Sequence, residues 1–187
     1  MKPCGRTGWT WLISLCLLAL LGGCGAPVKM AVVRPGQSVG EIKLGMTLAQ
    51  VQQVVGVPRV KKQLPDGYTY AYPSAGLSIF AGPADKPLLA RVMRITCGSG
   101  LAENSVWLRN FWGKTHEGVG IGTSREEVLK TYGPPEAGPA LQNYHPRTDE
   151  GELLYHARGI IFFFEQDKLV RMVVIPAAPP RTPATHP

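Results

Sequence analysis

Histidine and cysteine are the side chains that could act here as bases or nucleophiles, and each occurs four times among the 187 residues. A hydrolase needs a nucleophile with a base within hydrogen-bond reach. The metalloprotease pattern H-E-x-x-H and the phosphate-loop pattern G-x-x-x-x-G-K-[S/T] are both absent from the sequence. The histidines fall in turn-like sequence, in a strand-like run and in the tail: His116, His145, His156 and His186. We therefore expect no catalytic residue and no enzyme activity.

Acidic side chains crowd the stretch R-T-D-E-G-E at 147–152. Asp149, Glu150 and Glu152 could hold a cation, but they lack the D-x-[DN]-x-[DN]-G order of a calcium loop. The pattern favours a solvated acidic turn that bends at Gly151. We expect neither a metal site nor a cofactor.

The pattern of residues at the amino end predicts a targeting segment. Two positive residues, Lys2 and Arg6, precede an apolar run over 9–21 that is shorter than the roughly 20 residues a membrane-spanning helix needs. Such a run, followed by small residues, is typical of a secretory signal peptide. The residues Leu21-Gly22-Gly23-Cys24 resemble the lipobox of bacterial lipoproteins, in which the signal is cut before a cysteine that is then acylated. The alternatives are an ordinary signal peptide and an uncleaved anchor.

The lipobox resemblance implies a location. Several acyl chains on Cys24 would hold the chain firmly at a membrane, whereas one chain binds only marginally. In Gram-negative lipoproteins an Asp after the cysteine is the usual signal for retention in the inner membrane, and this chain has Gly25 there. We therefore expect a lipid-anchored protein of the outer membrane that faces the periplasm.

Charge and the remaining cysteine exclude other classes. The net charge is +7, but the basic residues are scattered and no nucleic-acid-binding motif accompanies them, so we expect no nucleic-acid partner. Cys4 and Cys16 would leave with the signal peptide. Cys97 is then the only thiol left, and its place in R-V-M-R-I-T-C predicts a buried, inert side chain.

One segment occurs twice, at 44–58 and 121–135, with an offset of 77 residues. The matched pairs are Gly45 and Gly122, Thr47 and Ser124, Val51 and Val128, Gly56 and Gly133, and Pro58 and Pro135. Each copy predicts a short helix. A capping box starts it, a glycine in the left-handed conformation ends it, and a proline forbids its continuation.

The likeness continues into strand-like runs, where 67–82 corresponds to 152–166 and 89–95 to 169–175. These runs are rich in aromatic and β-branched residues and predict antiparallel strands. The predicted fold class is α+β, with two tandem helix-plus-antiparallel-sheet units. The predicted organisation is a signal peptide (1–23), a flexible tether (24–38), a first α+β repeat (39–97), a second repeat with a bridging segment (98–175) and a disordered Pro-rich tail (176–187). The bridge predicts either an extra strand or a helical turn.

The motif I-x-L-G-M-[T/S]-x-x-x-V-x-x-x-x-G-x-P at 42–58, which returns at 119–135, resembles a superfamily of helix-then-sheet proteins. One branch holds the SmpA/OmlA (BamE-like) outer-membrane lipoproteins, which accessorise the machine that assembles β-barrels. Another holds the secreted β-lactamase-inhibitor proteins, which carry two such units in tandem. The resemblance implies that fold and a protein-binding habit.

Aromatic residues mark a candidate binding face. Tyr68, Tyr70 and Tyr72 alternate, so a strand would show all three on one face. They either fill the core or, together with the acidic turn that holds Asp149, Glu150 and Glu152, contact a partner. We expect a non-enzymatic protein-binding scaffold with an envelope partner, in a role such as outer-membrane biogenesis. The alternatives are an inhibitor of a periplasmic or secreted hydrolase and a peptidoglycan- or glycan-binding module, and the oligomeric state is left open.

Overall fold

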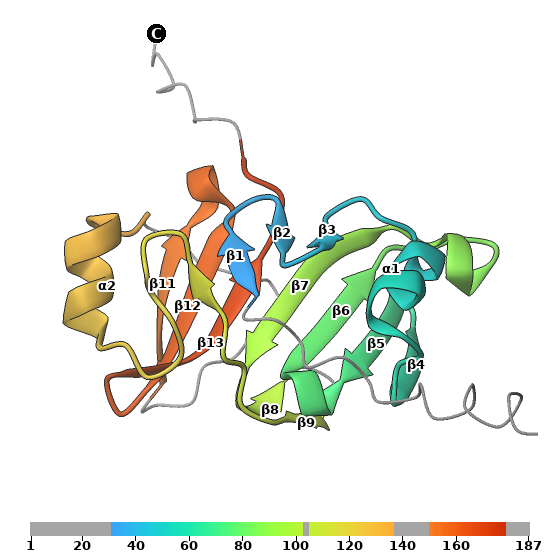
Figure 1. The fold of residues 1–187 in the computed structure, drawn as a ribbon. Coiled ribbons are helices and arrows are strands. Elements are labelled where there is room, and N and C mark those ends of the chain that lie inside the picture. Colours follow the sequence, from blue (N-terminus) through green and yellow to red (C-terminus); the bar gives the residue numbers. More distant parts are fainter. Residues whose placement is uncertain (1–30, 103–104, 137–149, 179–187) are drawn as a thin grey trace, which may run out of the picture.

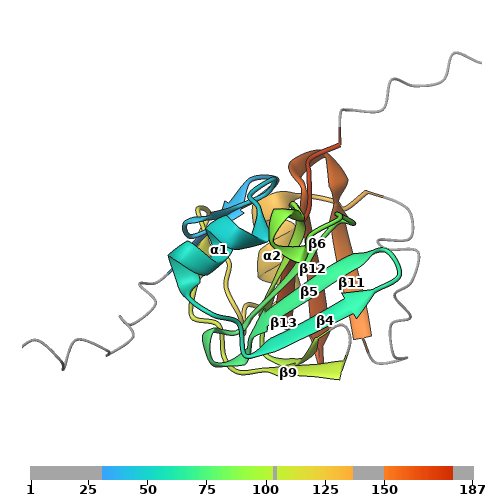
Figure 2. The ribbon, with the colours of Figure 1, turned by 90° about the vertical axis from the view of Figure 1, so that its right-hand side faces the viewer.

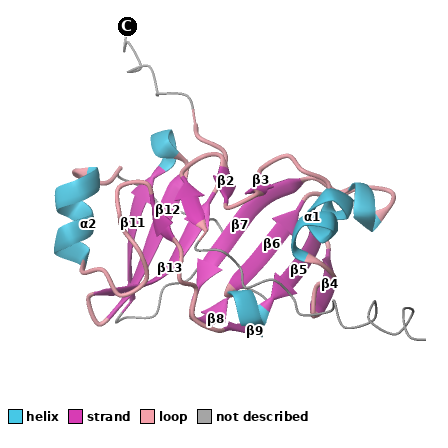
Figure 3. Cartoon of the chain, in the orientation of Figure 1, coloured by secondary structure: helices cyan, strands magenta, loops and turns pink. Residues whose placement is uncertain are grey.

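The computed structural model describes residues 31–102, 105–136 and 150–178, which form three sheets and two α-helices (Figure 1). Strands dominate this part of the chain, as Figure 3 shows. The predicted signal peptide, with Cys24, and the tail beyond residue 178 lie outside the described residues. None of the described helices combines the length and the apolar character that crossing a membrane would take.

The main sheet has seven strands in the order β11-β12-β13-β7-β6-β5-β4, and every neighbouring pair is antiparallel. Its strands are β4 (Val60–Leu64), β5 (Gly67–Tyr72), β6 (Leu77–Ala81), β7 (Val92–Gly98), β11 (Glu150–Tyr155), β12 (Ile160–Glu165) and β13 (Lys168–Val174). The two sequence copies meet at its centre, where β13 pairs with β7 from Arg171 opposite Gly98 to Val174 opposite Ile95.

This pairing overturns the predicted fold class. Two tandem helix-plus-sheet units are wrong, because strands from both copies make one continuous sheet and the whole is a sheet-rich fold. The physical reason lies in the edges. Two separate sheets would each expose unpaired backbone N–H and C=O groups on β7 and β13, and joining these strands satisfies both rows. The repeat therefore survives as matching local contacts within a single sheet.

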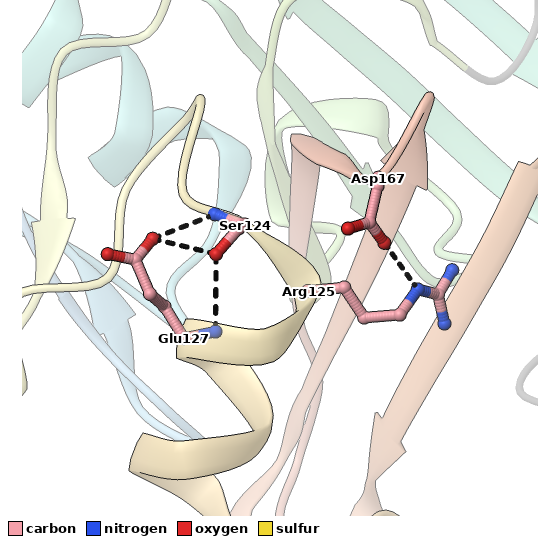
Figure 4. Close-up of polar contacts among 4 residues, drawn as sticks. All are labelled: Ser124, Arg125, Glu127 and Asp167. Carbon is pink, nitrogen blue, oxygen red and sulfur yellow. Dashed lines mark hydrogen bonds and ion pairs between the residues drawn. The ribbon is translucent and has the colours of Figure 1, made fainter.

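Both helices start with the predicted capping box. In α2 (Arg125–Tyr132) the Glu127 carboxylate accepts hydrogen bonds from the N–H and hydroxyl of Ser124, at 3.0 and 2.9 Å (Figure 4). The Ser124 oxygen in turn accepts from the N–H of Glu127 at 3.3 Å. In α1 (Leu48–Val55), Thr47 and Gln50 make the same reciprocal bonds. The first four N–H groups of an α-helix have no acceptor within the helix, and these capping boxes supply acceptors for some of them.

Both helices also end alike. Gly56 and Gly133 have φ values of 81° and 79°, positive as predicted. Their ψ values near −166° place them beyond the left-handed helical region, in a conformation open almost only to glycine. A tyrosine from the sheet holds each end, since Tyr72 donates its hydroxyl hydrogen to the Gly56 carbonyl at 3.1 Å and Tyr155 donates to the Gly133 carbonyl at 2.7 Å.

A small sheet in the order β10-β1-β2-β3 lies with both helices on one side of the main sheet (Figure 2). Its strands are β1 (Val32–Arg34), β2 (Ser38–Val39), β3 (Ile42–Lys43) and β10 (Lys114–Thr115). Residues 32–38 were expected in a flexible tether, but Val33 is fully buried in the core and β1 pairs in parallel with β10. A strand of three residues is too short for an alternation of apolar and polar side chains to be recognised, so the sequence did not predict it.

Candidate protein-binding surface

The three predicted binding tyrosines lie on the helix side of the sheet. Tyr70 and Tyr72 are 4% and 7% exposed within the main core, and Tyr68 is half-buried with its hydroxyl donating to the Ala84 carbonyl at 3.1 Å. Burial, with Tyr70 nearby, raises the pKa of Tyr72 to about 12, so its hydroxyl remains a neutral donor. In this structure Tyr70 and Tyr72 stabilise the fold, and only Tyr68 offers surface to a partner.

The predicted acidic contacts lie far from the tyrosines. Glu150 and Glu152 belong to β11, Asp149 lies outside the described residues, and Glu152 is half-buried. Four strands separate β11 from β5, so at about 4.8 Å per strand the two sets lie roughly 24 Å apart. The structure therefore places Glu150 and Glu152 apart from the three tyrosines.

A hydrolase-like pattern that the sequence reasoning missed is present at 36–40, where G-Q-S-V-G matches G-x-S-x-G. In hydrolases this serine stands on an exposed turn between a strand and a helix. Ser38 instead lies in β2, is 3% exposed and pairs with Arg34 and Lys43 on neighbouring strands. No described side chain hydrogen-bonds its hydroxyl, so the geometry does not support a nucleophile at Ser38.

The remaining groups that could react or bind a metal are the Cys97 thiol and the histidine and acidic side chains. Cys97 is fully buried, its thiol donates to the Met172 carbonyl at 3.6 Å, and burial raises its pKa far above the ordinary value. Among residues 31–102, 105–136 and 150–178, no cluster of three or more histidine, cysteine or acidic side chains could hold a metal ion.

A short hairpin presents a large aromatic side chain to solvent. It is formed by β8 (Gly100–Ala102) and β9 (Val106–Leu108), and it settles the bridging segment as strand. Leu101 lies directly opposite Trp107 in the register, so both side chains share one face of the hairpin. They are 49% and 67% exposed.

The other face of this hairpin is fixed against the main sheet. Ala102, Val106 and Leu108 are buried with Ala71 of β5 on the side of the sheet that faces away from the helices. Period-two alternation therefore forces Trp107, between two buried residues, to point outward.

Polar contacts hold the hairpin in place. The Arg171 guanidinium donates to the Leu101 carbonyl at 2.5 Å and lies over the Phe163 ring at 4.9 Å from its centroid. Backbone bonds from Ser99 to Val170 and from Arg109 to Pro73, both 2.9 Å, fix the two ends. These bonds attach the strand that carries Trp107 to the rest of the fold.

An open groove of about 510 Å³ runs between the hairpin and the β12–β13 turn. Its lining includes Ser99, Trp107, Arg109, Asn110, Glu165 and Val170. We call Leu101, Trp107, Arg109, Asn110 and Glu165 the Trp107 surface. It combines an apolar anchor with a cation, an anion and an amide, which together can pack against and hydrogen-bond a peptide chain. The one sequence signal for it was the V-W-L alternation at 106–108.

Comparisons of the chain with protein-family models, with curated proteins and with solved structures find no match. The resemblance to the BamE-like and β-lactamase-inhibitor proteins therefore stays a prediction.

Proposed function

We propose that this chain is a lipid-anchored protein of the bacterial cell envelope that binds another protein through the Trp107 surface. The observation that carries the proposal is the 67% exposure of Trp107 on a hairpin whose other face is buried. Single exposed apolar residues are common on soluble proteins. Here, however, an exposed leucine is paired with the tryptophan, a groove lies beside them, and hydrogen bonds hold the hairpin against the main sheet.

The composition of this surface matches that of binding hot spots. Tryptophan and arginine are enriched among residues that cost most binding energy when truncated, and a rigid scaffold limits the entropy lost on association. Arg109 and Glu165 lie in the same groove and would set the orientation of a polar partner segment. Tyr70 and Tyr72 are buried, so Tyr68 is the one of the three tyrosines that could contact an enzyme in the hydrolase-inhibitor alternative.

The anchor and the location rest on the sequence. Cys24 follows a signal-like segment with small residues before it, and the mature chain would begin at that acylated cysteine. The membrane would then be one partner and an envelope protein the other, with the outer membrane as the location. The chain acts in this proposal by binding and carries no reaction.

Affinity purification of the tagged chain from gently solubilised cells tests this function. Trp107→Ser should lower recovery of a stoichiometric protein partner at least tenfold, while Trp112→Ser, which changes another tryptophan that is 75% exposed, should retain it. Equal recovery with both variants, or no stoichiometric protein with the wild type, contradicts the proposal. Trp107-dependent pelleting with purified peptidoglycan, without a protein partner, would replace it with a glycan-binding function.

A further inference from the structure

The two outer strands of the main sheet, β11 and β4, differ in how their edges are covered. At β11, the N–H of Glu136 donates to the Leu154 carbonyl at 2.8 Å. At β4, the backbone hydrogen bonds to other described residues all go to β5, and none reaches the outer edge of the strand.

The register shows which backbone groups β4 offers. Leu64 lies opposite Gly67 across a two-residue turn, and the pair that flanks such a turn exchanges hydrogen bonds. Since bonded and non-bonded pairs alternate, the N–H and C=O groups of Lys61 and Gln63 point away from β5. The N–H of Arg59 donates to the Ala71 carbonyl at 3.0 Å, which fits this phase with a bulge at the start of the strand.

Charge decides what can pair with this edge. The exposed residues of and beside β4 include Arg59, Lys61 and Lys62 against the single acidic residue Asp66 in the turn. A second copy of β4 would bring lysine against lysine, and like charges on facing strands destabilise pairing. An extended segment that carries glutamate or aspartate would instead meet opposite charge from Lys61 on one face of the sheet and from Lys62 on the other.

We propose that the outer edge of β4 accepts an extended, acidic segment of a partner protein as an added strand. Strand addition takes its affinity from main-chain hydrogen bonds and its specificity from side chains at alternate positions. The site is separate from the Trp107 surface and stands whether or not that surface binds. The two are neighbours, because Val60 of β4 packs against the buried face of the β8–β9 hairpin (Figure 2).

Fluorescence anisotropy with the purified chain tests the site. The probes are a labelled heptapeptide that alternates glutamate with valine, and its counterpart with lysine in place of glutamate. The glutamate peptide should bind at least tenfold more tightly than the lysine peptide. Its binding should protect the amide hydrogens of Lys61 and Gln63 from exchange, while those of Lys62 and Leu64 change little.

Two variants separate strand addition from simple charge attraction. Gln63→Pro removes one outward N–H at a position where an edge strand tolerates proline, and it should weaken binding at least tenfold with the fold retained. Lys61→Glu should weaken binding to a similar degree, while Lys168→Glu, the same charge change on exposed Lys168 of β13, should leave it within twofold. Equal binding of both peptides, no binding, or full binding by folded Gln63→Pro overturns the proposal.

Discussion

The hydroxyl of Tyr155 donates a hydrogen bond to the carbonyl oxygen of Gly133 at 2.7 Å, which ties the end of α2 to β11, an outer strand of the main sheet. The equivalent bond from Tyr72 to Gly56 ties the end of α1 in the same way at 3.1 Å. The glycines are 77 positions apart and the tyrosines are 83 positions apart, so corresponding residues of the two copies make the same contact twice. The sequence repeat is therefore a repeat of physical contacts, even though the strands merge into one sheet.

Removing either hydroxyl should weaken its helix attachment. Tyr155→Phe and Tyr72→Phe each delete one hydrogen bond while keeping the buried ring, so the free energy of unfolding should fall by about 1 kcal/mol for each. Chemical denaturation measures this loss. Because the two sites lie in different parts of the sheet, the double variant should lose the sum of the two effects. Unchanged stability in both variants would show that these bonds do not hold the helices.

The cap of α2 should respond to pH, and that of α1 should not. Hydrogen bonds from the N–H and hydroxyl of Ser124 hold the pKa of Glu127 below its ordinary value of 4.5. A lowered folded-state pKa contributes stability that is complete above the unfolded value and is lost as pH falls through the folded value. The equivalent residue in α1, Gln50, does not titrate.

Glu127→Gln converts the α2 cap into the α1 type and should remove this dependence. The difference in unfolding free energy between wild type and Glu127→Gln should shrink as the pH is lowered from 7 to 3. Urea titrations at several pH values measure it. A difference that stays constant with pH would show that the carboxylate is not part of the cap.

The described body should unfold as one unit. Residues of both copies, such as Leu48, Val51, Val128 and Phe162, share one buried cluster, and β7 and β13 are paired across the middle. Calorimetry should therefore give a single transition whose calorimetric and van't Hoff enthalpies agree. Two separate transitions would restore the picture of independent units.

Gly98→Ala should disturb the pairing of β7 with β13, where the two copies meet. A Cβ at Gly98 would lie 2.4 Å from the Val170 carbonyl oxygen and 2.8 Å from the Arg171 Cα, both of them backbone atoms that cannot move freely. We expect the whole transition to shift to lower temperature, with a loss of about 1–3 kcal/mol. Gly100→Ala separates crowding from backbone strain, because no heavy atom lies within 4 Å of its Cβ position but its φ is 88°, so any loss there comes from the backbone conformation alone.

The Cys97 thiol should not react with thiol reagents while the protein is folded. It is fully buried, and burial raises its pKa, so almost no thiolate forms near neutral pH. Labelling by a maleimide at pH 7.5 should follow the rate of unfolding, and Cys97→Ser should define the background from other thiols. Complete labelling within minutes under native conditions would contradict the burial.

Local signals in the sequence predicted local structure well. The Thr47 and Ser124 caps, the positive φ of Gly56 and Gly133, and the alternation of Tyr68, Tyr70 and Tyr72 are all present. Each depends on residues within a few positions of one another, and short-range sterics and hydrogen bonds decide them.

Long-range pairing was beyond the sequence. The sequences around Arg171 and Gly98 do not indicate that β13 pairs with β7, because antiparallel strands of similar composition can pair in several orders. The side of the sheet on which the tyrosines lie could not be predicted either. Alternation shows that three tyrosines share a face, but not which face a helix covers. It was Trp107, between buried Val106 and Leu108, whose outward position the same rule fixed.

The most direct test of the proposed function is site-specific photo-crosslinking in intact cells. A photoreactive amino acid in place of Trp107 should join the chain to one defined envelope protein, and the same group in place of Trp112 should give at least tenfold less of that product. Cys24→Ala should abolish the crosslink by releasing the chain from the membrane. A Trp107 product that persists in Cys24→Ala would contradict the anchor, and the absence of any protein crosslinked at Trp107 would contradict the protein-binding surface itself.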